Sequence, residues 1–255
     1  MNKRPLILIT NDDGITARGI HCLAEAVRDL GDIIVVAPDG PRSGQSSGIT
    51  VDSLLRLTPR EFGEGIEAYS VNGTPADCVK LAMHALMRER RPDIILAGIN
   101  HGSNSGNSVN YSGTMGAVIE GCFAGVPSVG YSLLDHSHNA DFSFILPMVT
   151  EITRKVLSTG LPKDICLNIN FPKGIVPKGL KMAAGARGRW TEEYEGYVSP
   201  HGKPFYLLTG KYIEENPDDD TTDNYWLSRG WATIVPVRPD QTAFDQIKPL
   251  EYLTL

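Results

Sequence analysis

The sequence predicts an α/β protein with a Rossmann-like, mostly parallel sheet flanked by helices and a C-terminal β-hairpin arm. Short apolar runs without a helical period occur at residues 6–10 (LILIT), 33–37 and 94–97. Runs of this length and composition are typical of strands buried on both faces of a parallel sheet. Helical patterns separate the runs, and a strand, a helix and a strand in succession form a right-handed βαβ unit.

Length and composition fit one large α/β domain, with or without an appended subdomain. The chain has 255 residues, of which 41% are hydrophobic and 21% charged, as in ordinary globular proteins. The net charge of -6 disfavours binding to a nucleic-acid duplex. No apolar run reaches membrane-spanning length, and no secretory signal is recognised, so we expect a cytoplasmic protein that binds no membrane. The four cysteines form no CxxC pair and indicate neither a zinc site nor a disulfide framework.

The helices of the core have clear periodicity or clear start signals. Apolar residues at three- and four-residue steps predict a helix over residues 20–30, ending near Gly31. Thr74, Pro75 and Asp77 suit the N-cap, N1 and N3 positions of the next helix, as in a capping box. The remaining expectations for the core are an irregular pair of strands within residues 49–67, strands at 68–71, 126–133 and 165–171, a helix from Ser112 onward, and a helix over 141–157 with Pro147 near its first turns.

After residue 177 the composition changes and the alternation of strands and helices ends. Residues 194–198 and 205–212 flank a turn and predict a long aromatic hairpin, whose simplest cover is a partner subunit. The acidic stretch 218–223 is interpreted as a solvated helix start. We therefore expect a catalytic core over residues 1–177, an oligomerisation arm over 178–230, and a return strand (231–237) with a tail over 231–255.

Several polar side chains follow strands of the alternating region. Asp12 and Asp13 come directly after the first strand, where a plain turn and a metal site remain equal alternatives on this stretch alone. Ser43 and Asn100 follow two further strands, so all four side chains would meet at one edge of the sheet. Their donors are all oxygens, which suits Mg²⁺ or Mn²⁺.

Two predicted helix starts lie at the same edge, at Thr74 and at residues 112–114. Free N–H groups at a helix N-terminus bind anions, although the start at Thr74, taken alone, is at least as well explained as a structural cap. The long Gly- and Asn-rich loop 98–113 is not a P-loop, because the GK[ST] ending is absent. A divalent cation beside an anion site is what phosphoryl transfer requires. His101 in this loop is either the acid that protonates the leaving group or a solvent-facing side chain.

The sequence resembles the SurE family of metal-dependent nucleotide phosphatases. The resemblance rests on ILITNDDG (7–14), APDGPRSG (37–44), NGTPADCVKLA (72–82) and GINHGSNSGNSVNYSGTMGAVIEG (98–121), in this order and spacing, with the later RGRW and VSPHGKPFY segments. Met115 is the one position where a smaller residue is expected. The resemblance implies metal ligands at Asp12, Asp13, Ser43 and Asn100, and a phosphate pocket lined by Asn11, Asn104, Ser112, Gly113 and Thr114.

The resemblance also implies a reaction and an assembly. The reaction is hydrolysis of nucleoside 5′- and 3′-monophosphates with Mg²⁺ or Mn²⁺, in a homodimer or homotetramer that exchanges its C-terminal arm. We expect Asp12 and Asp13 to hold the metal and one of them to orient or deprotonate the attacking water; a phospho-aspartate at Asp12 is the alternative. Two other classes of function stay open, a nucleotide-sugar transferase and a nucleotide-sensing module.

Overall fold

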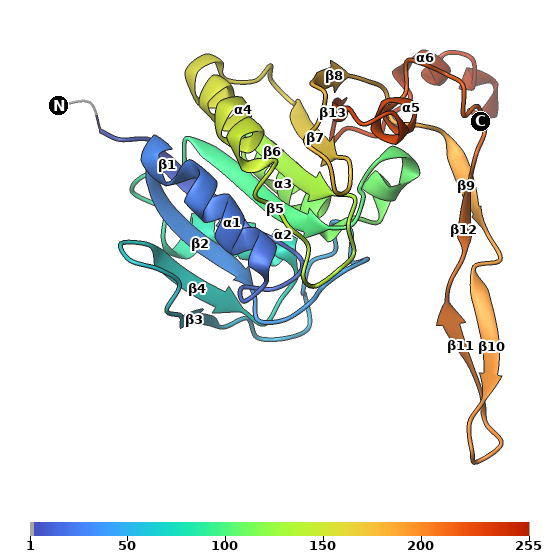
Figure 1. The fold of residues 1–255 in the computed structure, drawn as a ribbon, viewed down its shortest axis with the longest axis horizontal. Coiled ribbons are helices and arrows are strands. Elements are labelled where there is room, and N and C mark those ends of the chain that lie inside the picture. Colours follow the sequence, from blue (N-terminus) through green and yellow to red (C-terminus); the bar gives the residue numbers. More distant parts are fainter. Residues whose placement is uncertain (1–2, 255) are drawn as a thin grey trace.

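The computed structural model describes residues 3–254 and has a three-layer core with an arm extending from it (Figure 1). The fold class predicted from the sequence is confirmed. The elements are β1 (Leu6–Thr10), α1 (Arg18–Val27), η1 (Arg28–Leu30), β2 (Asp32–Pro38), β3 (Leu57–Pro59), β4 (Glu67–Val71), α2 (Pro75–Ala85), β5 (Ile94–His101), η2 (Gly106–Asn110), α3 (Gly113–Phe123), β6 (Ser128–Leu133), α4 (Leu146–Thr159), β7 (Cys166–Phe171), β8 (Leu180–Met182), β9 (Gly188–Thr191), β10 (Tyr194–Val198), β11 (Pro204–Leu208), β12 (Lys211–Glu214), α5 (Asp223–Ser228), β13 (Ala232–Val237), α6 (Phe244–Ile247) and η3 (Glu251–Leu253).

A nine-stranded sheet forms the middle layer, with strand order β3-β4-β2-β1-β5-β6-β7-β13-β8. The six strands from β4 to β7 run parallel to one another. β3 pairs with β4 antiparallel, and β13 pairs antiparallel with β7 but parallel with β8. β13 therefore extends the sheet beyond β7, and β8 forms the edge of the sheet on that side.

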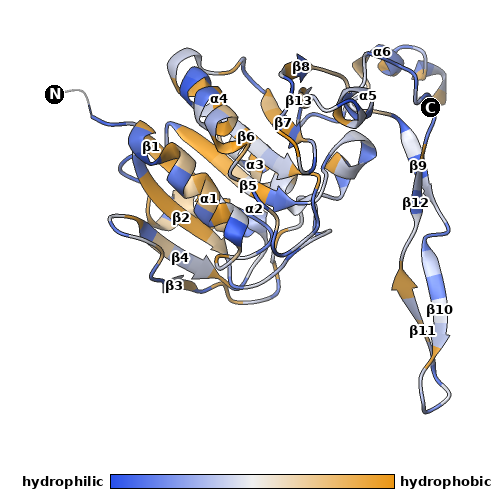
Figure 2. Ribbon diagram, in the orientation of Figure 1, coloured by the Kyte–Doolittle hydropathy of each residue, from blue (hydrophilic) through white to orange (hydrophobic). Residues whose placement is uncertain are grey.

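Helices cover both faces of the sheet, which explains why β1 is apolar at almost every position. α1 and α4 pack on one face, while α2 and α3 pack on the other (Figure 1). In β1, Ile7 and Ile9 join the core under α1 and α4, whereas Leu6 and Leu8 join the core under α2 and α3. Successive side chains of a strand point to opposite faces, so a strand covered on both faces needs apolar residues at every position. The central strands are accordingly hydrophobic along their length (Figure 2).

The arm is a two-part antiparallel ribbon that extends from the core. β9 pairs with β12, and beyond them β10 pairs with β11, with Tyr197 opposite Phe205 (Figure 1). All five residues of β11 are exposed, and several of them are apolar (Figure 2). The hairpin expected from the sequence is thus present, and its aromatic side chains have no cover within the described chain.

The helical expectations hold with shifted boundaries. α2 begins with the predicted capping box, in which Thr74 accepts from the Asp77 N–H and Asp77 accepts from the Thr74 N–H. α4 begins at Leu146 rather than at residue 141, because Pro147 occupies its first turn. No helix within residues 3–254 combines the length and apolar character needed to cross a bilayer.

Candidate active site

The candidate site lies where the direction of strand order reverses. From β1 the chain proceeds outward to β2 and β4, then crosses back to β5 on the other side of β1. In open α/β sheets, such a switch point leaves a crevice beyond the carboxyl ends of the two central strands. Asp12 and Asp13 follow β1, and Asn100 lies near the end of β5, so the switch point brings them together. The pairing of β5 with β6 is irregular between Ala97 and Asn100, which re-aims the end of the strand.

The two carboxylates are held by different neighbours. Asp12 is 4% exposed, and its Oδ1 accepts a 2.6 Å hydrogen bond from the Thr114 hydroxyl. The Asp13 Oδ2 accepts from the His101 N–H at 3.2 Å, which ties it to the end of β5. Burial, with a further contribution from Asp13, raises the pKa of Asp12 from 3.8 to about 6. Burial also raises the pKa of Asp13, against the opposing effect of His101.

Ser43 reaches the site on the loop that follows β2. The Arg42 N–H donates to the Asp12 carbonyl oxygen at 2.6 Å. Farther along the loop, Ser46 donates through its hydroxyl to the Asn110 carbonyl and through its N–H to the Tyr111 carbonyl, at 2.7 and 3.1 Å. Both ends of this segment are thereby fastened to the other site loops, so Ser43 is held at the cavity although it is exposed.

The N-terminus of α3 faces the same crevice. Ser112 is its N-cap, and its hydroxyl accepts from the Met115 N–H at 3.0 Å. A Cβ at Gly113 would lie 2.8 Å from the Asp12 Cβ, so only glycine lets the helix begin this close to the carboxylate. The first N–H groups of α3 therefore lie beside Asp12, where they can bind a phosphate oxygen.

Asn104 is fixed by a buried polar network on β6 and β7. Its N–H donates to the Asn170 Oδ1 at 2.9 Å, and its amide donates to the Ser132 hydroxyl at 2.8 Å. Its carbonyl accepts from the Asn168 amide, also at 2.8 Å. These four residues are all under 9% exposed. The Asn104 amide keeps one further N–H for a ligand, and the network fixes the direction of that N–H.

One cavity of about 470 Å³ joins most of these groups. The predicted residues that line it are Asp12, Ser43, Asn100, Asn104 and Ser112, together with His101. Three predicted residues do not line the cavity but contact residues that do. Asp13 accepts from the His101 N–H, and Gly113 and Thr114 contact Asp12. Asn11 is fully buried, and its amide donates to the Gly14 carbonyl at 2.9 Å, so it shapes the turn after β1.

Part of the wall of this cavity is made of residues that no pattern in the sequence indicates. Trp190, Glu193, Tyr194, Leu208 and Thr209, all from the base of the arm, line it as well. They lie at least 78 positions beyond Ser112, which is the last predicted site residue in the chain that lines the cavity. No local pattern links them to it. The RGRW segment belongs to the family resemblance, but the resemblance assigns it no role in the site.

Asp223 corrects the prediction of a solvated helix start at residues 218–223. It begins α5 but is fully buried, and its carboxylate accepts from the N–H groups of Gly106, Ala186 and Asn224 at 2.8 to 2.9 Å. Burial raises the pKa of Asp223 in spite of these three hydrogen bonds. The carboxylate thus joins the loop after β5 to the start of the arm.

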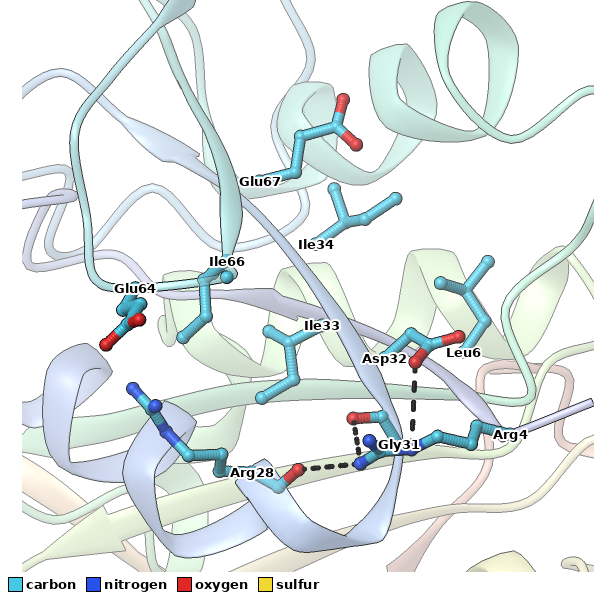
Figure 3. A pocket seen from close by; sticks show the side chains of 11 residues that line it. Arg4, Leu6, Arg28, Gly31, Asp32, Ile33, Ile34, Glu64, Ile66 and Glu67 are labelled. Carbon is cyan, nitrogen blue, oxygen red and sulfur yellow. Dashed lines mark hydrogen bonds and ion pairs between the residues drawn. The ribbon is translucent and has the colours of Figure 1, made fainter.

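A second cavity, of about 440 Å³, lies at the opposite edge of the sheet, near the amino ends of β1 and β2 (Figure 3). Its central cation is already bound: the guanidinium of Arg4 lies 3.7 Å from the Asp32 carboxylate and donates to the Arg28 and Gly31 carbonyls. Since these groups are already satisfied, this cavity is the weaker candidate for a functional site.

The residues at the switch point fit a divalent cation. Among the ion pairs of residues 3–254, none includes Asp12 or Asp13. A buried carboxylate next to a half-buried one, neither with a cationic partner, is costly, and a bound dication removes that cost. The hydroxyl of Ser43 and the amide oxygen of Asn100 add neutral oxygen donors, as Mg²⁺ and Mn²⁺ prefer. The described residues hold no cluster of three or more His, Cys, Asp and Glu side chains suited to a metal, which matches a donor set half made of neutral groups.

Comparison with known proteins assigns the chain to a family. The family model described as Survival protein SurE matches residues 7–192, which include every residue predicted for the site. The chain belongs to the SurE family. A relative named 5′-nucleotidase SurE from Christiangramia forsetii is 46% identical over 99% of this chain and 98% of its own length. One of the same name from Bacteroides fragilis is 44% identical over 98% of this chain and 99% of its own length.

A solved structure agrees with the SurE assignment. The crystal structure of the SurE protein from Aquifex aeolicus superposes with a TM-score of 0.84 at 34% identity, and the match covers 98% of this chain and 99% of that one. The SurE resemblance inferred from the four sequence blocks is therefore confirmed. The fold match extends through the arm and the C-terminal segment as well as the core.

Proposed function

We propose that this SurE-family chain is a metal-dependent 5′-nucleotidase that hydrolyses nucleoside 5′- and 3′-monophosphates to nucleoside and phosphate. Relatives that match it over almost their whole length carry the name 5′-nucleotidase SurE. The observation that carries the proposal is the meeting of the buried Asp12 carboxylate and the half-buried Asp13 carboxylate, neither of them in an ion pair, with the N-terminus of a helix at the switch point of the sheet.

The oxygen atoms of Asp12, Asp13, Ser43 and Asn100 would hold the cation. Once bound, Mg²⁺ or Mn²⁺ supplies Lewis-acid polarisation of the phosphoryl group and a lowered pKa for attacking water. The chain's own groups perform the rest. The N–H groups at the start of α3 and the free N–H of Asn104 bind the phosphoryl oxygens as charge develops on them. The Thr114 hydroxyl holds the Asp12 carboxylate in one orientation through its 2.6 Å hydrogen bond.

Water attack and a covalent intermediate at Asp12 are the two routes to the same product. Each carboxylate already accepts one hydrogen bond, Asp12 from the Thr114 hydroxyl and Asp13 from the His101 N–H, so each keeps one oxygen with which to orient or deprotonate the attacking water. His101 lines the cavity, and its Nδ1 lies 2.9 Å from the Ser137 carbonyl oxygen, which leaves Nε2 for a leaving group. Rapid quenching with a labelled phosphate donor tests the covalent route, because only that route leaves label on the protein.

Phosphate release from a panel of 5′- and 3′-monophosphates, with Mn²⁺, with Mg²⁺ and with a chelator, tests the function. We expect turnover that the chelator abolishes and that Asp12→Asn and Ser43→Ala reduce. Asp52→Asn, an exposed carboxylate outside the cavity, is the matched control and should keep full turnover. Activity that persists in the chelator, or in Asp12→Asn, would overturn the proposal.

The arm supports an oligomer in this proposal. Val198 and Tyr206 are each about 70% exposed and Leu207 is 52% exposed, so β10 and β11 present a large apolar surface for a single chain. We propose that a second copy covers it in a homodimer or homotetramer. Light scattering should give a multiple of 27.8 kDa for the wild type. Replacing Tyr206 and Leu207 by Asp should shift the mass toward that of one chain.

A further inference from the structure

Part of the wall of the cavity that Asp12 lines is aromatic, and none of the groups proposed to bind the metal or the phosphate belongs to it. Trp190, Tyr194 and Leu208 from the base of the arm form this wall, and Tyr111 lines the cavity beside them. The cavity volume of about 470 Å³ falls in the range of roughly 300 to 1,000 Å³ that holds a small-molecule ligand. A phosphoryl group at the switch point fills only a small part of it, so the remainder is available to the leaving group of the substrate.

The Trp190 ring is supported as a platform. It lies on β9 opposite Tyr212 of β12, and the two ring centroids are 5.5 Å apart at an interplanar angle of 64°. The Tyr212 hydroxyl donates to the Ala186 carbonyl at 3.1 Å, which fixes that ring in turn. Trp190 keeps 38% of its surface exposed, so it is braced from the Tyr212 side and open toward the cavity. An aromatic ring held in this way offers a face on which a flat ligand group stacks.

The platform is also tied to the phosphate end of the site. The Asn107 amide donates to the Gly188 carbonyl at the start of β9. The Asp223 carboxylate accepts from the N–H groups of Gly106 and Ala186, at 2.8 and 2.9 Å. The loop after β5 and the base of the arm therefore move together. This fixes the distance between the aromatic wall and the carboxylates, as recognition of both ends of one substrate requires.

The charges of the lining indicate what the platform binds. No Lys or Arg is among the residues that line this cavity in the described chain, and Glu193 stands in the aromatic wall. Apart from His101 and His136, the lining residues offer no side chain that can carry positive charge to a second or third phosphate. A neutral planar ring with N–H donors suits a wall made of Trp190 and a carboxylate.

We infer that Trp190 stacks on the nucleobase of the substrate, and that the base of the arm is therefore a nucleobase subsite. This inference rests on the proposed nucleotidase function and adds to it the group that separates nucleotides from other phosphate esters. Stacking of one base on an aromatic side chain is worth a factor of roughly 5 to 150 in binding. The platform discriminates between a phosphate ester with a base and one without, whereas it leaves the reacting end unchanged.

Two substrates that differ only in the base test the inference. AMP and ribose 5-phosphate carry the same phosphate on the same sugar carbon. In Trp190→Ala we expect kcat/KM for AMP to fall by roughly 5- to 150-fold, mainly through KM, with kcat/KM for ribose 5-phosphate within about twofold of the wild type. Trp190→Phe should restore most of the activity on AMP. Tyr252→Ala removes an exposed aromatic ring outside the cavity and should change neither substrate.

An equal loss for AMP and ribose 5-phosphate would assign Trp190 a structural role and overturn the inference, as would an unchanged AMP reaction. Binding of adenosine, measured by calorimetry, gives a readout that needs no turnover. We expect Trp190→Ala to weaken it by the same factor as kcat/KM for AMP. If the wild type released phosphate from neither ester, the proposed function would fail, and the adenosine titration alone would decide whether the subsite exists.

Discussion

Neutralising Asp12 should stabilise the metal-free protein while it destroys the metal site. The Asp12 carboxylate is 4% exposed, and burial, with the charge of Asp13 added, raises its pKa from 3.8 to about 6. A shift of about two pKa units makes the ionised folded form roughly 3 kcal/mol less favourable. Asn at this position has no charge to bury, and its amide oxygen still accepts the hydrogen bond from the Thr114 hydroxyl. Metal-free Asp12→Asn should therefore unfold with up to about 3 kcal/mol more free energy at pH 8.

The pH dependence follows from the sign of this shift. The folded-state pKa is raised, so the stability that protonation of Asp12 confers is fully present below about pH 4. It is lost as the pH rises through about 6. The advantage of Asp12→Asn should accordingly be small at pH 4 and complete at pH 8.

Thermal unfolding in a chelator, at pH 4 and pH 8, measures this difference. For a chain of this size, about 3 kcal/mol corresponds to a rise of roughly 6 °C or more in Tm. Addition of Mn²⁺ should raise the Tm of the wild type but not that of Asp12→Asn, because only the wild type binds the ion. Asp52→Asn, an exposed position, should shift neither value. A metal-free Asp12→Asn protein that is less stable than the wild type at pH 8, or a difference that does not change with pH, would refute the reasoning.

Three further predictions concern the frame of the site. Asn170→Ala removes the acceptor of the Asn104 N–H and should cost about 1–3 kcal/mol in urea unfolding, together with a lower kcat; an unchanged kcat would contradict the role of the network. Asp77→Ala should cost about 1–2 kcal/mol at pH 7. Burial raises the pKa of Asp77, but hydrogen bonds from Thr50 and from the N-cap outweigh it and leave the pKa below its usual value, so this cost should shrink as the pH falls below 4; a cost independent of pH would contradict it. Gly19→Ala places a Cβ 1.9 Å from a backbone oxygen of β5. It should lower the free energy of unfolding in urea by about 1–3 kcal/mol, and an unchanged unfolding midpoint would show that β5 moves aside without cost.

Features that depend on a few neighbouring residues could be predicted from the sequence. The apolar run at β1 marks a strand covered on both faces, and its end determines where Asp12 and Asp13 lie. The Thr74 and Asp77 pair marks the start of α2, and Ser112 marks the start of α3. In each case the signal is local, because strand alternation and helix capping involve residues at most four positions apart.

Features that depend on residues far apart in the chain could not be predicted from the sequence. Asp223 looked solvated because its neighbours in sequence are acidic, whereas the folded chain brings the N–H groups of Gly106 and Ala186 to its carboxylate. In the same way, nothing in residues 188–214 points to the strand ends of the core, yet Trp190 lines the same cavity as Asp12.

The sequence by itself determined the kinds of element, their order and the oxygen-rich character of the segments that follow the strands. Only the tertiary structure decided that β1 lies between β2 and β5, that β13 runs antiparallel to β7, and that the arm forms one wall of the cavity. The physical reason is that local preference concerns the conformation of a segment, whereas its partner is chosen by the burial and hydrogen bonding of surfaces that are far apart along the chain.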